Sequence, residues 1–201
     1  GTAQVQLDSL AHGQATLTQR KFYRVTGGST QNKGVIPDIR LVDIYNEEFG
    51  ERKAKNALKW DTIPTAPFKR EGSVKPYVQQ LDQASEQRVS VEPQFKYLEQ
   101  RKAIAKKSDE QKRIVLDIEQ RKAELIALEQ ETLHAENQRR QATGQKPYAN
   151  WESYQAALDG LAEARAKMKA NQRPALPEDE AFVTEAANIL MDYAKLQNAN
   201  K

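Results

Sequence analysis

The spacing of apolar residues changes once along this chain of 201 residues, and that change constrains the fold more than any other feature. Apolar and polar residues alternate from Ala3 to Leu7, and they alternate again over Gln14–Val25, which is rich in Thr, aromatic and β-branched residues. From Tyr77 onward, apolar residues recur every three or four positions. Alternation is typical of strands, and the longer spacing is typical of amphipathic helices. We therefore predict an α+β chain, mainly α, in which a short antiparallel β segment precedes a helical C-terminal domain.

Glycine and proline mark where the β segment turns and where it ends. His12 and Gly13 lie between the two alternating runs and predict the turn of a hairpin. Gly27 and Gly28 end the second strand, because glycine accepts backbone angles that other residues avoid. Pro37 cannot donate a hydrogen bond to a sheet, so the stretch around it is predicted to be an edge or an exit from the sheet.

The middle of the chain has an irregular pattern. A short helix is predicted over Glu47–Leu58, followed by a stretch, residues 59–76, with three prolines and one glycine. This stretch is either a linker or a segment laid over a neighbouring surface. Trp60 favours the second alternative, because a large aromatic side chain is rarely left in free solvent.

Five helical segments are predicted in the remainder. Asp117 is a suitable N-cap and Gly144 a suitable residue just beyond the end of the third helix. The last helix carries a wide apolar face, which predicts that this face is buried. The predicted helices cover residues 76–89, 92–107, 118–143, 151–170 and 178–198, and the apolar face of the last comprises Phe182, Val183, Ala186, Ile189, Leu190, Tyr193 and Ala194.

Charge and composition exclude several classes of function. The 31 Lys and Arg residues are interleaved with 28 Asp and Glu residues, and the signs alternate along Lys106–Glu124. A phosphate-binding surface needs one sign on one face, so we predict no nucleic-acid partner. No apolar run reaches the roughly 20 residues needed to cross a bilayer, so no membrane span is predicted. The chain has no Cys and hence no disulfide or thiolate metal site.

No complete catalytic or metal-binding set is evident from the residues alone. His12 and His134 are far apart and have no ligand spacing, so they are interpreted as turn or surface residues. The Gly27-Gly28 turn lacks the Lys-Ser/Thr ending of a phosphate-binding loop. Carboxylates on amphipathic helices are interpreted as solvated groups. We predict no metal and no cofactor.

Three stretches of the chain carry a resemblance to a known family: "KFYRVTGGSTQNKGVIPDI", "NALKWD" and "FVTEAANILMDYAKL". They resemble the carboxy-terminal processing peptidases, in particular the tail-specific protease branch of Gram-negative bacteria. The most specific is "KFYRVTGGSTQNKGVIPDI" (Lys21–Ile39), which departs from that branch at Thr26 and Ile36, where Asn and Thr are usual. The stretch "NALKWD" (56–61) and the ending "FVTEAANILMDYAKL" (182–196) are similar to further parts of the same branch. The resemblance covers the whole chain.

The resemblance also implies a role for the start of the chain. In that family the catalytic Lys lies in a Gly-Lys-Gly-Thr-Val-Gln stretch, about two dozen residues after the nucleophilic Ser. "GTAQ" (1–4) is similar to the last four of these positions, with Ala3 in place of Val. Gln4 therefore falls on the position of the Gln that orients the Lys. The catalytic Lys would then precede Gly1, and the fragment would lack both the catalytic Ser and the catalytic Lys of the family.

The family thus implies a domain organisation and a function. Residues 1–43 would be the C-terminal end of the serine peptidase core, residues 44–90 a connecting segment and residues 91–201 a helical C-terminal domain. The parent would be a periplasmic serine endopeptidase, and its partners would be protein substrates with apolar C-terminal tails and an adaptor docking on the helical domain. The alternative is a non-enzymatic helical interaction module, although such a module has no need of the motifs in residues 1–39.

Overall fold

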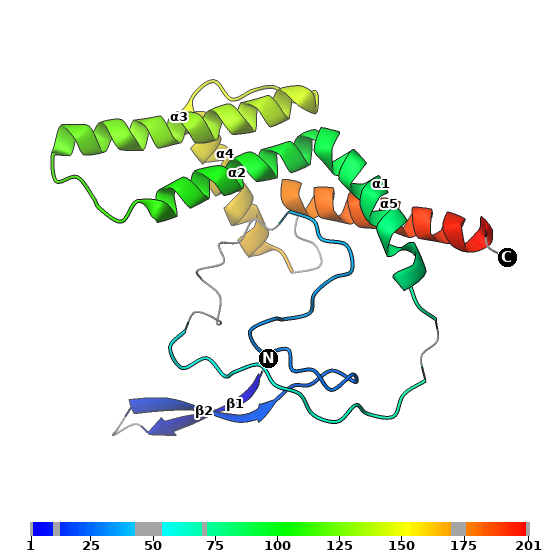
Figure 1. Cartoon of the computed structure of the whole chain (residues 1–201). Coiled ribbons are helices and arrows are strands. Elements are labelled where there is room, and N and C mark those ends of the chain that lie inside the picture. The colour runs from blue at the N-terminus through cyan, green and yellow to red at the C-terminus, as the bar shows by residue number, and fades with distance from the viewer. Residues whose placement is uncertain (1, 10–12, 43–53, 70–71, 170–175, 200–201) are drawn as a thin grey trace. The chain divides into compact units, whose positions relative to one another are not determined.

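The computed structural model describes residues 2–9, 13–42, 54–69, 72–169 and 176–199 (Figure 1). The chain divides into two compact units, each described by itself. Unit 1 comprises residues 1–38 and 47–76, and unit 2 comprises residues 39–46 and 77–201. The predicted fold class is confirmed, because two antiparallel strands precede five helices among the described residues.

A two-stranded hairpin opens unit 1. Strands β1 (Thr2–Ser9) and β2 (Gly13–Lys21) pair antiparallel. The register sets Val5 opposite Leu17 and, two residues along on the same face, Leu7 opposite Ala15. Gln4 and Gln6, opposite Thr18 and Thr16, occupy the other face. The hairpin predicted from alternation is confirmed, while His12 lies outside the described residues.

Strand β2 ends at Lys21, four residues before the predicted end at Val25, and the chain then turns sharply at the two glycines, as predicted. Gly27 has a φ of +86° and donates its amide to the carbonyl of Arg24 at 2.8 Å. The segment after Trp60 then runs beside this turn, since Ser29 N donates to Asp61 O at 3.0 Å and Ile63 N donates to Gly27 O at 2.9 Å. Residues 61–66 are thus laid over the glycine turn, as the second of the two alternatives predicted.

The helix predicted over Glu47–Leu58 is wrong for its described part. Residues 54–58 form a single turn, closed by a hydrogen bond from Ala57 N to Ala54 O at 3.0 Å, and then an irregular stretch. A lone turn of helix gains one hydrogen bond for several fixed residues, so it needs packing that this short stretch does not find. Residues 47–53 lie outside the described residues.

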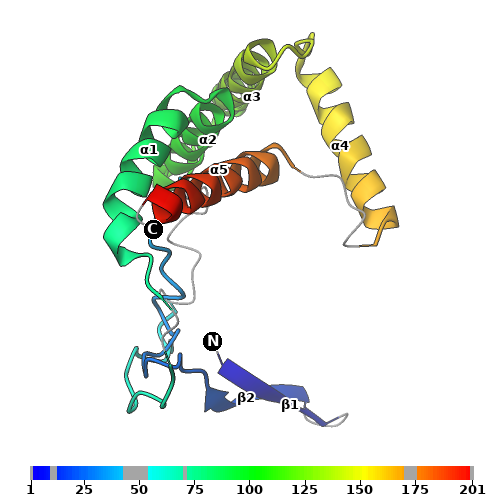
Figure 2. The same cartoon turned by 90° about the vertical axis from the view of Figure 1, so that its right-hand side faces the viewer.

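Unit 2 contains the five helices, which follow the short 3-10 turn η3 (Lys75–Tyr77). Helices α2 and α3 form an antiparallel hairpin, and α5 packs against α1 and α2 (Figure 1). Helix α4 contacts α3 and stands apart from α5 (Figure 2). The helices are α1 (Val78–Val91), α2 (Pro93–Glu110), α3 (Ile118–Ala142), α4 (Trp151–Lys167) and α5 (Pro177–Ala199).

Local signals in the sequence set the ends of α3. The Asp117 carboxylate accepts a hydrogen bond from Gln120 N at 2.8 Å, so the predicted N-cap is confirmed. At the other end, Gly144 has a φ of +72° and donates to Gln141 O at 3.2 Å, while Gln145 N donates to Arg140 O at 2.7 Å. These two bonds form a Schellman motif and satisfy the last carbonyls of the helix.

The core of unit 2 lies where α2, α3 and α5 meet. Leu98 is 1% exposed and Phe95 2% exposed, and Ala135 and Ala181 close the cluster from α3 and α5. The Phe95 and Phe182 rings meet edge to face, with centroids 5.8 Å apart. Burying one such aromatic side chain contributes about 1.5–3 kcal/mol, so burial of this cluster stabilises unit 2.

The prediction that the whole apolar face of α5 is buried is wrong. Phe182, Ile189 and Tyr193 turn inward and are at least partly buried. Val183 is 69% exposed and Leu190 is 66% exposed, and Ala186 and Ala194 are exposed with them. The apolar set spans too wide an arc for the single groove between α1 and α2 to cover, so half of it faces away.

Candidate functional site

Gln4 lies beside a break in the regular pairing of the hairpin. Ala3 pairs with Arg20 and Gln4 pairs with Thr18, so Gln19 is an extra residue on β2. Such a bulge increases the local twist and redirects the side chains next to it, and bulges are frequent near active sites. The site predicted from sequence thus lies at a local irregularity of the strand.

The Gln4 side chain is exposed on the polar face of the hairpin. Its amide nitrogen donates to the Thr18 hydroxyl at 3.5 Å, a long and weak hydrogen bond. Among the described residues, its carboxamide oxygen accepts no hydrogen bond. The oxygen is therefore available to accept a hydrogen bond from an amine. Gly1, the first residue of the "GTAQ" stretch, lies outside the described residues.

Lys21, at the far end of β2, is engaged elsewhere. Its ammonium donates to the Asp61 carboxylate at 2.8 Å and to the carbonyl of Lys59. Tyr23 also donates to Asp61, at 3.1 Å. The hydrogen bond from Lys21, followed by that from Tyr23, holds the pKa of Asp61 below its usual range. A lysine whose ammonium donates hydrogen bonds to two acceptors is not placed to act as a general base. We therefore interpret this cluster as a structural contact that joins the end of β2 to residues 59–61.

The "GGST" motif forms the backbone of a tight crossing. A Cβ added to Gly27 would lie 2.1 Å from the carbonyl oxygen of Ile63, so glycine is required there. Ser29 and Gln31 are 3% and 0% exposed, and the Ser29 hydroxyl accepts a hydrogen bond from Gln31 N at 3.0 Å. The motif that carries the resemblance is thus structural in this unit: it fixes residues 61–63 against the turn.

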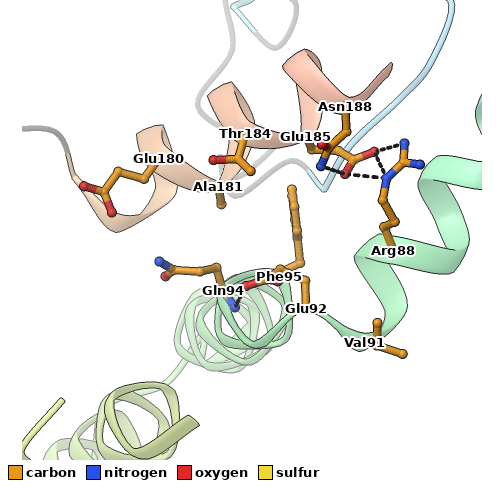
Figure 3. A pocket seen from close by; sticks show the side chains of 10 residues that line it. All are labelled: Arg88, Val91, Glu92, Gln94, Phe95, Glu180, Ala181, Thr184, Glu185 and Asn188. Carbon is orange, nitrogen blue, oxygen red and sulfur yellow. Dashed lines mark hydrogen bonds and ion pairs between the residues drawn. The ribbon is translucent and has the colours of Figure 1, made fainter. Parts of the chain in front are cut away.

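Unit 2 holds a cavity of about 310 Å³ between α1, α2 and α5 (Figure 3). Arg88 and Glu185 close one end of it. The Arg88 guanidinium contacts Glu185 at 2.8 Å and Asp192 at 2.7 Å, and the Glu185 side chain is only 4% exposed. Burial favours a raised pKa of Glu185, but hydrogen bonds, first that from Arg88, outweigh it and lower the pKa. Glu185 is therefore a charged structural partner rather than a free general base.

A second buried ion pair joins two residues of α3. Arg139 contacts Glu136 at 2.7 Å, and both side chains are 5% exposed. The hydrogen bonds that Arg139 donates to Glu136 raise the pKa of Arg139, and the Arg139 guanidinium lies 5.3 Å from the centre of the Tyr97 ring. Burial raises the pKa of Tyr97 far above its usual value. Each ionised group has its partner, as a packed interior requires.

The remaining candidate residues do not come together as a site within the described residues. His134 is exposed on α3, where its ring contacts the side chain of Gln138 at 2.8 Å. Within the described residues, no group of three His, Cys, Asp or Glu side chains has the arrangement of a metal site. None of the helices that the structure describes is long and apolar enough to span a bilayer.

Sequence reasoning missed the cluster of Arg88, Glu185 and Asp192. Arg88 is 97 residues from Glu185 along the chain, so spacing carries no trace of the contact. One signal was present: Glu185 lies between the apolar residues Phe182 and Ile189 on the inward side of α5. A carboxylate at such a position needs a cationic partner.

Comparison with known proteins identifies the family. Residues 44–195 match the family described as "C-terminal domain of tail specific protease (DUF3340)". This match covers most of the chain, and the chain belongs to this family. The resemblance read from the sequence is thereby confirmed, while residues 1–43 precede the matched range.

One curated relative supports the same family. The Haemophilus influenzae protein named Tail-specific protease is 37% identical over 123 residues. The alignment covers 59% of this chain and 18% of the relative. The alignment thus spans less than a fifth of the relative's length.

Proposed function

We propose that this chain is the C-terminal part of a periplasmic tail-specific serine endopeptidase that uses a Ser-Lys mechanism. The observation that carries the proposal is the family match over residues 44–195. The motifs in residues 1–39 extend it to the end of the peptidase core. The parent cleaves proteins that it recognises by apolar C-terminal tails.

Gln4 is the residue of this chain that we assign to the catalytic machinery, as a positioning residue. A serine hydroxyl is a weak nucleophile until a base takes its proton, and a lysine acts as that base only in its neutral form. A carboxamide oxygen that accepts a hydrogen bond from the amine fixes its direction, as the third member of a triad does. The Gln4 oxygen accepts no hydrogen bond from the described residues, and Gln4 lies beside the bulge; both observations support this role.

The fragment has no peptidase activity of its own under this proposal, because its Ser and Lys partners belong to the upstream part of the parent. The helical unit encloses the substrate or docks an adaptor protein. The assay incubates the purified chain with an unfolded protein that ends in small apolar residues. No cleavage is expected. Cleavage that persists through repurification would overturn the assignment of the catalytic residues.

The role of Gln4 is tested in the intact parent, with Gln6 as a matched control. Gln6 is exposed on the same face two residues along β1. Gln4→Ala is expected to lower the turnover rate by about ten- to ten-thousandfold, as the loss of an orienting partner does. Gln6→Ala is expected to leave the rate unchanged, and both variants are expected to keep the melting temperature. Equal rates in the two variants would remove Gln4 from the site.

A further inference from the structure

The connection between α2 and α3, residues 111–117, carries the most exposed large apolar side chain among the described residues. Leu116 is 97% exposed, and Ile114 and Ile118 on either side are 68% and 67% exposed. Val115 between them is half-buried. A group of apolar side chains that are exposed side by side is a common feature of interaction surfaces.

Between its two ends, the backbone of this connection has no backbone hydrogen-bond partner among the described residues. Within the described part of the chain, residues 112–116 form no backbone hydrogen bond; the nearest bonds are from Gln111 N to Ser108 O and from Arg121 N to Asp117 O. Asp117 has extended backbone angles, φ −68° and ψ 122°. Ile114 and Val115 are β-branched, and β-branched residues favour strands. Unpaired amides and carbonyls beside exposed alternating apolar residues fit one kind of partner, another extended strand.

We propose that this connection pairs antiparallel with the same connection of a second copy of the chain. The sequence "RIVLD" (113–117) is self-complementary about Val115. With Val115 on a two-fold axis, Arg113 lies opposite the second copy's Asp117, and Ile114 lies opposite its Leu116. Each ion pair and each apolar pair then occurs twice, as an isologous interface requires.

The charges select this register and this occupant. Arg113 and Asp117 are exposed, and neither forms an ion pair within the described residues. Asp117 already caps α3 through Gln120 N, but a carboxylate has room for further hydrogen bonds. A shift of the register by one residue would place Arg113 opposite an apolar side chain. A tail or loop of unrelated sequence would not supply both charges at this spacing.

Sedimentation equilibrium of the whole chain tests the proposal. One short strand from each copy makes a small interface, so a dissociation constant of about 10–1000 µM is expected. Arg113→Glu and Asp117→Lys each place like charges opposite one another and are expected to weaken the dimer at least about tenfold. An equimolar mixture of the two variants restores opposite charges at both positions and is expected to recover the dimer.

Lys102→Glu is the matched control, because Lys102 is exposed on α2 and removed from the connection. It is expected to dimerise like the unchanged chain. Since Asp117→Lys removes a helix cap, its helical content is checked by circular dichroism. The chain contains no Cys, so Val115→Cys adds an independent measurement: it is expected to form a disulfide-linked dimer much faster than Lys102→Cys.

Three outcomes would overturn the proposal. The first is a chain that stays monomeric to about 1 mM, even if it binds an extended apolar peptide or the rest of the parent at this connection. The second is equal weakening by Arg113→Glu and Lys102→Glu, which would place the association elsewhere. The third is a mixture that fails to recover the dimer although both variants are folded, which would refute the register.

Discussion

Arg88→Ala is predicted to destabilise unit 2 through the charge that it leaves behind. In the unchanged chain, the Arg88 guanidinium donates from Nε to both oxygens of Glu185 at 3.1 Å and from Nη2 to Oε1 at 2.8 Å. It also donates from Nη1 to Asp192 at 2.7 Å. Removing Arg88 therefore leaves a buried carboxylate without its cation and loosens the contact between α1 and α5.

The size of the stability loss in Arg88→Ala follows from the burial of Arg88 and Glu185. Removing one partner of a fully buried ion pair costs about 3–5 kcal/mol. The Glu185 side chain is 4% exposed, but that of Arg88 is 33% exposed, so solvent screens part of the interaction. We therefore expect a loss of about 2–3 kcal/mol at pH 7. For a unit of this size, the melting temperature should fall by about 5–12 °C.

The loss should depend on pH with a defined sign. In the unchanged chain the pKa of Glu185 is lowered, so its contribution to stability is present above the unfolded pKa of about 4.3 and is lost as the pH falls through the folded pKa. In Arg88→Ala, burial is no longer offset by Arg88, so the pKa of Glu185 rises. The variant then takes up a proton on folding, and its deficit should shrink as the pH falls from 7 to about 4.

Urea denaturation followed by circular dichroism at several pH values measures these differences. Arg88→Ala combined with Glu185→Gln is the control, because the second change removes the buried charge. The double variant should be more stable than Arg88→Ala at pH 7, with a difference between them that vanishes in acid. A deficit of Arg88→Ala that is the same at pH 7 and pH 4 would refute the reasoning and attribute the loss to packing alone.

Three further predictions concern the scaffold. Gly27→Ala should cost at least about 2 kcal/mol and make unit 1 sensitive to proteolysis, because its Cβ would lie 2.1 Å from Ile63 O; a resistant variant would contradict the crossing. Phe95→Ala should lower the free energy of unfolding, measured by urea denaturation, by about 3–5 kcal/mol. A loss below about 1 kcal/mol would show that the core lies elsewhere. Hydrogen exchange should be slow near Leu98 and fast near Val5, since a lone hairpin is marginal in water; the reverse order would make unit 1 the stable unit.

The sequence was most informative where structure is decided locally. The capping of α3 by Asp117 and its ending at Gly144 depend on residues within four or five positions, so both could be predicted. The hairpin likewise follows from alternation and a turn. The crossing of residues 61–63 over Gly27 was only one of two alternatives, because only Trp60 pointed to it.

Contacts between distant segments decide the features that the sequence did not reveal. The exposure of Val183 and Leu190 depends on how much of α5 the groove of α1 and α2 can cover, which the apolar pattern of one helix does not contain. The same holds for Lys21 and Asp61, which are 40 residues apart and interact as a pair. Carboxylates on the helices were interpreted as solvated groups, and this was wrong for Glu136 and Glu185, which are buried and paired with arginines.

The hairpin links the proposed catalytic role of Gln4 to the rest of the parent. Its polar face carries Gln4, and its opposite face exposes Leu7 and Leu17, which are 54% and 53% exposed. Two strands make a ribbon that twists easily, so the direction of the Gln4 side chain is fixed only when the apolar face is packed. Under the proposed function, packing of Leu7 and Leu17 in the peptidase core therefore positions Gln4. Leu17→Asp in the intact parent should accordingly lower the turnover rate, although Leu17 lies on the face away from the reacting groups. A fully active Leu17→Asp parent would show that Gln4 is positioned without that packing.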